Sequence, residues 1–139
     1  MHRVFSLFYY GKQHLWTGVR NYFAGIFSYL YVKVYFFIIL SVNAALWLIA
    51  RFIKTSVGTE QMALHYNVDF GIDYYGSAGK IYIIPFLGLV IMLVNFSLFA
   101  AVSGHKDRKF ISHVLFTSAL TANLTLLVAI VSVYLVNFR

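Results

Sequence analysis

The residues best suited to bind a ligand lie in one polar segment, residues 55–80, between long apolar runs. The candidate recognition site combines an imidazole, a phenol, an amide, two carboxylates and a glycine: His65, Tyr66, Asn67, Asp69, Gly71 and Asp73. A ring nitrogen together with several oxygen donors can hold a divalent cation. The alternative is that these groups only hydrogen-bond within the loop and structure it.

The backbone of this segment decides whether those groups can meet. Apolar and polar side chains alternate from Met62 to Tyr74, a period of two that indicates a β-strand. Side chains on one face of a strand are spaced about 6.7 Å apart, so they would converge on one ion only if the backbone bent at Gly71. In a helix, His65 and Asp69 would instead be neighbours at i, i+4. An isolated strand has no ladder partner, so we expect this one to lie on a membrane surface, fold back as a hairpin around Gly71, or pair with another chain.

Catalytic motifs are absent from the sequence. It contains no recognised spacing of nucleophile, base and orienting group, no glycine-rich phosphate loop and no helical metal pair. It has no cysteine, which excludes disulfides and thiolate sites within this chain. We therefore expect a non-enzymatic protein with no catalytic, cofactor or metal site.

Composition places these residues in a membrane protein. Hydrophobic residues make up 61% of the 139 residues and charged residues 11%, and the mean hydropathy is +0.78, far from the usage of a soluble domain. Residues 34–53, 81–103 and 114–138 are apolar runs close to the roughly 20 residues that cross a bilayer. The expected fold is an all-α integral membrane protein with three transmembrane helices. One membrane domain, residues 32–139, would contain an external loop, 55–80, with possible β-strand character, and a cytoplasmic loop, 104–113.

The N-terminal segment, residues 1–31, is aromatic and basic. Twelve residues separate Arg20 from Lys33, which is too short for a span. Aromatic side chains beside cations are typical of a helix at the lipid headgroup boundary. We predict an interfacial amphipathic helix here.

Basic residues near the spans predict the orientation. Seven lie on the N-terminal side of the predicted membrane and four on the other: Arg3, Lys12, Arg20, Lys33, Lys106, Arg108 and Lys109 against Arg51, Lys54, Lys80 and Arg139. This bias predicts a cytoplasmic N-terminus and an external C-terminus. The net charge is +7, and the basic residues flank apolar runs. This placement indicates lipid headgroups as partners and not nucleic acid.

The spans carry amides and hydroxyls that we expect to mediate helix packing: Asn43, Asn95, Ser118, Thr121, Asn123, Thr125 and Ser132. On the last span, Ser118, Thr121, Thr125, Ala129 and Ser132 follow steps of three, four, four and three, which forms one small, polar stripe. Small residues let helix backbones approach, and asparagines hydrogen-bond between helices. The stripe is therefore predicted to face protein. The alternative is a polar permeation path, which three helices cannot enclose without oligomerising.

The segment from Glu60 to Val90 resembles a domain of unknown function found in small bacterial membrane proteins. The shared pattern is His-aromatic-Asn, then Gly, Asp and Gly, before a span that opens with Pro. It is matched by His65, Tyr66, Asn67, Gly71, Asp73, Gly76 and Pro85. The resemblance covers under a quarter of the chain, and Ala63 stands where that domain usually has proline. It implies an inner membrane protein with an external motif loop, similar to proteins that give immunity to a secreted killing peptide.

Three functions follow as hypotheses. The first is a non-enzymatic structural or accessory subunit that assembles with itself or with a larger membrane complex. The second is a peptide- or ion-binding protein of immunity or sensor type that acts through the 60–80 loop. The third is a transporter component.

Overall fold

A computed structural model describes residues 27–57, 61–67 and 69–138 of the chain. Most of the predicted interfacial helix, residues 1–31, lies outside the described residues. The chain divides into two compact units, Met1–Val34 and Tyr35–Arg139. The candidate site belongs entirely to the second unit, which is described below.

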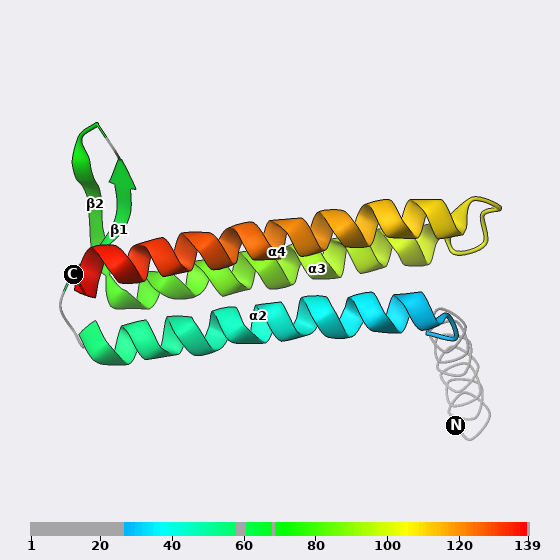
Figure 1. Ribbon diagram of the computed structural model, residues 1–139, viewed down its shortest axis with the longest axis horizontal. Coiled ribbons are helices and arrows are strands. Elements are labelled where there is room, and N and C mark those ends of the chain that lie inside the picture. Colours follow the sequence, from blue (N-terminus) through cyan, green and yellow to red (C-terminus); the bar gives the residue numbers. More distant parts are fainter. Residues whose placement is uncertain (1–26, 58–60, 68, 139) are drawn as a thin grey trace, which may run out of the picture. The chain divides into compact units, whose positions relative to one another are not determined.

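Three helices dominate the described residues (Figure 1): α2, Leu30–Val57; α3, Ile83–Val102; and α4, Arg108–Phe138. Each is long and apolar enough to cross a membrane, which confirms the prediction of three helices capable of spanning. Their ends differ from the predicted spans, since α4 begins inside the predicted loop 104–113. Hydropathy marks where a helix can enter lipid, whereas the hydrogen-bond ladder marks where it ends, and a helix can continue into water.

The segment between α2 and α3 is a β-hairpin. Strand β1, Gln61–Asn67, pairs antiparallel with β2, Gly71–Ser77, and the 3₁₀ helix η1, Ala78–Tyr82, leads into α3. Gly71 has a φ of +75°, a conformation that glycine adopts without a Cβ penalty. Of the expected arrangements, the chain takes the hairpin that folds back around Gly71, so the predicted strand character is confirmed as two strands instead of one.

The buried positions of all three helices follow a seven-residue repeat. On α4 the buried and half-buried line is Ser112, Phe116, Ala119, Asn123, Leu126, Ile130, Val133 and Asn137. On α2 it includes Ile39, Asn43, Leu46, Ala50 and Ile53. On α3 it is Pro85, Gly88, Met92, Asn95 and Phe99, which continue the spacing from Ile81 of η1. Alternating steps of four and three place these residues on one seam of each helix, the pattern of left-handed helix packing.

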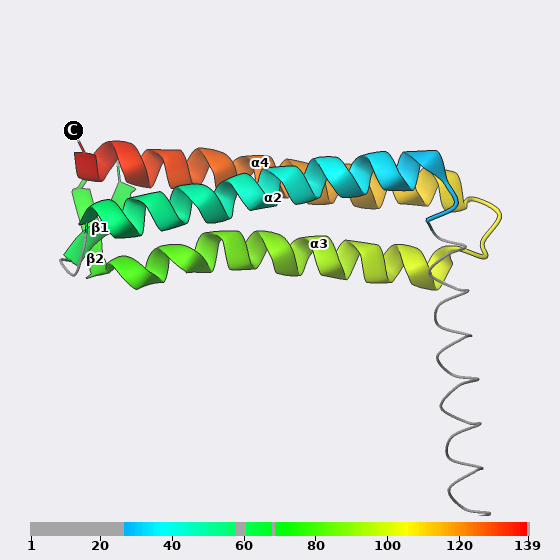
Figure 2. The same ribbon diagram turned by 90° about the horizontal axis from the view of Figure 1, so that it is seen from below.

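The hairpin is joined to one end of the helices. One core cluster contains residues of α2, β1, η1 and α4: Leu46, Ala50, Ile53, Met62, Ala78, Ile81 and Ile130. Figures 1 and 2 both show the hairpin at the end where α3 begins and α4 finishes. The fold therefore holds the candidate recognition loop against the ends of two helices.

Candidate functional site

His65 and Asp73 meet across the hairpin. The Nδ1 atom of His65 lies 2.6 Å from Oδ1 of Asp73. Bulges on either side of His65 shift the strand register there, so that His65 pairs with Tyr74 and its side chain reaches the neighbouring Asp73. Both side chains are partly exposed, which weakens their attraction by solvent screening.

The other predicted recognition residues do not join this pair. Asp69 is exposed in the turn, and Gly71 begins β2. Tyr66 and Asn67 lie in β1, but their side chains are outside the described residues. Among residues 27–57, 61–67 and 69–138, no three His, Cys, Asp or Glu side chains gather where they could hold a metal ion.

Asn137 fastens β1 to the last turn of α4. Its Oδ1 accepts a hydrogen bond from the backbone N–H of Ala63 at 2.9 Å, and its Nδ2 donates to the carbonyl of Ala63 at 2.8 Å. The amide thus pairs with β1 as a neighbouring strand would. It satisfies edge groups that are costly to leave unpaired near lipid.

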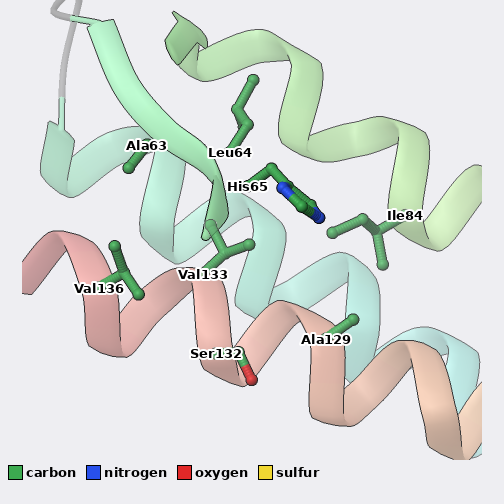
Figure 3. Close-up of a pocket in the computed structure, with 8 residues that line it drawn as sticks. All are labelled: Ala63, Leu64, His65, Ile84, Ala129, Ser132, Val133 and Val136. Carbon is green, nitrogen blue, oxygen red and sulfur yellow. The ribbon is translucent and has the colours of Figure 1, made fainter. Parts of the chain in front are cut away.

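A cavity of about 330 Å³ lies between β1, α3 and α4. It is lined by Ala63, Leu64, His65, Ile84, Ala129, Ser132, Val133 and Val136. Figure 3 shows the imidazole of His65 reaching toward Ile84, while the hydroxyl of Ser132 points away from it. The Ser132 hydroxyl donates to the carbonyl of Val128 at 3.0 Å. The cavity therefore combines apolar walls with one polar group, and Ser132 and His65 do not form a nucleophile and base pair.

No protein-family model, curated protein or solved structure matches this chain. The resemblance over Glu60–Val90 stays a prediction, and the site is interpreted from its own geometry.

A second polar cluster is buried between the helices. Asn43 is 3% exposed and Asn123 is fully buried. The Asn43 Nδ2 donates to Asn123 Oδ1 and to the Pro85 carbonyl, each at 3.1 Å, and Asn123 Nδ2 donates to the carbonyls of Ala119 and Gly88 at 3.0 and 3.3 Å. Each amide is satisfied, so these asparagines join α2, α3 and α4 at one level. Asn95 lies on the seam of α3 and donates to the carbonyl of Ile91 in its own helix.

The predicted polar stripe lies beside the buried seam of α4 and not on it. Ser118, Thr121, Thr125, Ala129 and Ser132 are each exposed among the described residues. The hydroxyl of Thr125, like that of Ser132, bonds to a carbonyl of its own helix, that of Thr121. The described helices of the chain therefore do not cover the stripe. That it faces protein stays a prediction, and that protein would be a second polypeptide.

That face of α4 is hollowed. A shallow groove of about 650 Å³ runs along it, lined by His113, Val114, Thr117, Ser118, Thr121, Ala122 and Thr125. Exposed residues elsewhere on the helices are mostly bulky, such as Phe37, Leu48 and Phe86. The groove exists because small side chains replace bulky ones along one line.

Aromatic rings and cations gather at the hairpin end of the helices. The rings of Trp47 and Tyr82 stack at 5.7 Å, the ammonium of Lys54 lies over the Tyr82 ring, and that of Lys80 lies over the Tyr74 ring. Aromatic rings with cations are typical of the membrane–water boundary.

Sequence reasoning missed Gly88 and Asn137. Gly88 lies within one predicted span, 81–103, and Asn137 lies near the end of another, 114–138. The signal for both is the seven-residue repeat, because each falls on a seam with the buried positions of its helix.

Proposed function

We propose that this protein is a non-enzymatic accessory subunit of the plasma membrane that assembles through the outer face of α4. The α4 face is defined here by Ser118, Ala122, Thr125, Ala129 and Ser132. The single observation that carries the proposal is the groove from His113 to Thr125 along the first part of this face, in a helix long and apolar enough to span a membrane.

The shape of the α4 face suits a second helix. Its residues are spaced by four, three, four and three, the same spacing as the buried seam. Two pairs within it, Ser118 with Ala122 and Thr125 with Ala129, have the small-xxx-small spacing that brings transmembrane helices into close contact. Lipid tails fill such a groove less completely than a facing helix does, so association gains dispersion contacts.

The internal packing of the chain supports the same interpretation. The buried seam already holds the chain's own helices together, with Phe116, Asn123 and Ile130 fully buried on α4. A second seam on the same helix is therefore not needed to build the monomer. Its hydroxyls are compatible with lipid or protein, because Thr125 and Ser132 are satisfied within α4, so close packing is the reason to expect a partner.

The proposed placement in the membrane follows the charge bias of the sequence. The N-terminus would be cytoplasmic, and the hairpin and the C-terminus would be external. The α4 face would then cross the bilayer, with His113 toward the cytoplasmic side and Ser132 toward the external side.

The experiment is to measure the mass of the full-length protein in a mild detergent and its self-association in vesicles by energy transfer between labelled copies. Ala122→Leu should reduce assembly by about tenfold, because the loss of close packing removes about 1–2 kcal/mol. Ala44→Leu is the matched control, since Ala44 is exposed on α2. A wild-type protein that is a strict monomer in detergent and in vesicles, with no co-purifying subunit, would refute the proposal.

A further inference from the structure

We propose that the cavity between β1, α3 and α4 binds a membrane lipid with a primary ammonium head group, which pairs with His65 and Asp73 while an acyl chain fills the apolar part. This inference requires that the protein is embedded in a membrane, and the cavity shares Ala129 and Ser132 with the α4 face.

The walls of the cavity select an apolar chain. Ile84, Leu64, Val133 and Val136 supply hydrocarbon surface from three elements. A volume of about 330 Å³ is at the lower end of the range of roughly 300–1,000 Å³ that small-molecule pockets occupy. That is enough for part of one chain and too little for a bulky ring system.

The position of the cavity favours a ligand that arrives from the bilayer. Ala129 and Ser132 line it and are also exposed on α4, so the cavity meets the outer surface of a helix suited to lipid. Asn137 and Ala63 hold β1 beside α4 through two hydrogen bonds, which keeps the space between strand and helices from closing. A lipid can therefore enter sideways without first leaving the membrane.

The polar end selects the head group. A carboxylate can only accept hydrogen bonds, so the short contact with Asp73 places a hydrogen on His65 Nδ1. Asp73 does not itself line the cavity, but it is bonded to His65, which does, and its carboxylate is an acceptor that carries negative charge. An acceptor with a negative charge suits a group with several N–H donors and a positive charge, which is a primary ammonium. A head group that carries a phosphate or carboxylate and no cation would instead be repelled by Asp73.

The test compares lipids that differ at the nitrogen alone. Full-length protein in maltoside micelles is given equal amounts of phosphatidylethanolamine and phosphatidylcholine with identical chains, and native mass spectrometry counts the lipid retained. Phosphatidylcholine has a quaternary nitrogen with no N–H donor. We expect a two- to fivefold preference for phosphatidylethanolamine, the range that a partly exposed charged contact provides.

Asp73→Asn should lower this ratio to about one, whereas Asp69→Asn, in the exposed turn of the same hairpin, should leave it unchanged. Ala129→Phe should fill the cavity and reduce retention of both lipids, while Ala122→Phe, one helical repeat earlier, should not. Equal retention of the two lipids by the wild type, or an unchanged ratio in Asp73→Asn with the hairpin intact by circular dichroism, would overturn the proposal. Ala122→Leu should disrupt assembly and preserve lipid preference, so failure of the lipid site and failure of assembly give different results.

Discussion

Replacing Gly88 by alanine is predicted to destabilise the protein although alanine favours helices. A Cβ at this position would lie 2.6 Å from Asn123 Oδ1 and 2.7 Å from Asn43 Nδ2. These distances are too short for any real contact, and both neighbours are buried amides bonded to each other. The added methyl group therefore has to displace the hydrogen bonds that join the three helices.

The magnitude follows from three opposing effects. Alanine gains about 1 kcal/mol of helix propensity over glycine. Overpacking costs about 1–3 kcal/mol, and loss of the hydrogen bond between the asparagines costs about 0.6 kcal/mol. The net loss is about 0.6–2.6 kcal/mol.

The assay is the free energy of unfolding in mixed micelles, obtained by titrating a denaturing detergent and following helix content. Gly79→Ala is the control, because a Cβ there meets nothing within 4 Å. In a background of Asn43→Ala with Asn123→Ala the amide atoms are gone, so Gly88→Ala should become neutral or stabilise by up to about 1 kcal/mol. If Gly88→Ala matched the wild type in stability, or cost the same in both backgrounds, the steric argument would be refuted.

Two further predictions concern the hairpin and the orientation. Asn137→Leu should remove both hydrogen bonds to Ala63, at a cost of about 0.5–1.5 kcal/mol each. Backbone amides of β1 should then exchange with deuterium faster, while those of α3 are unchanged. Equal protection of β1 in variant and wild type would contradict the role of Asn137 in holding β1 beside α4. Since the chain has no cysteine, Asp69→Cys and Gly104→Cys give clean single labels, and in intact cells a membrane-impermeant maleimide should react with the first alone; the opposite pattern would reverse the proposed orientation.

The sequence alone was sufficient to predict the three helices of the described residues that are long and apolar enough to cross a membrane. Long uncharged runs have one stable solution in lipid, a helix that satisfies its own backbone, so hydropathy predicts them directly. The alternation from Met62 to Tyr74 likewise predicted extended backbone, and Gly71 was the position where that backbone could turn. These are local properties, and neighbouring residues encode them.

Tertiary structure decided which polar groups meet. His65 and Asp73 are brought together by a bulged strand register, and alternation over a single strand does not contain that register. Asn43 and Asn123 pair because the seams of two helices coincide at that level, and hydropathy is the same for many relative rotations of a helix.

The α4 face shows the same division. The sequence identified four of its five residues, Ser118, Thr125, Ala129 and Ser132, and the structure placed them beside the buried seam and left them exposed. A stripe of small residues packs equally well against the chain's own helices or against another chain, and that choice depends on how completely the three helices already fill their common core.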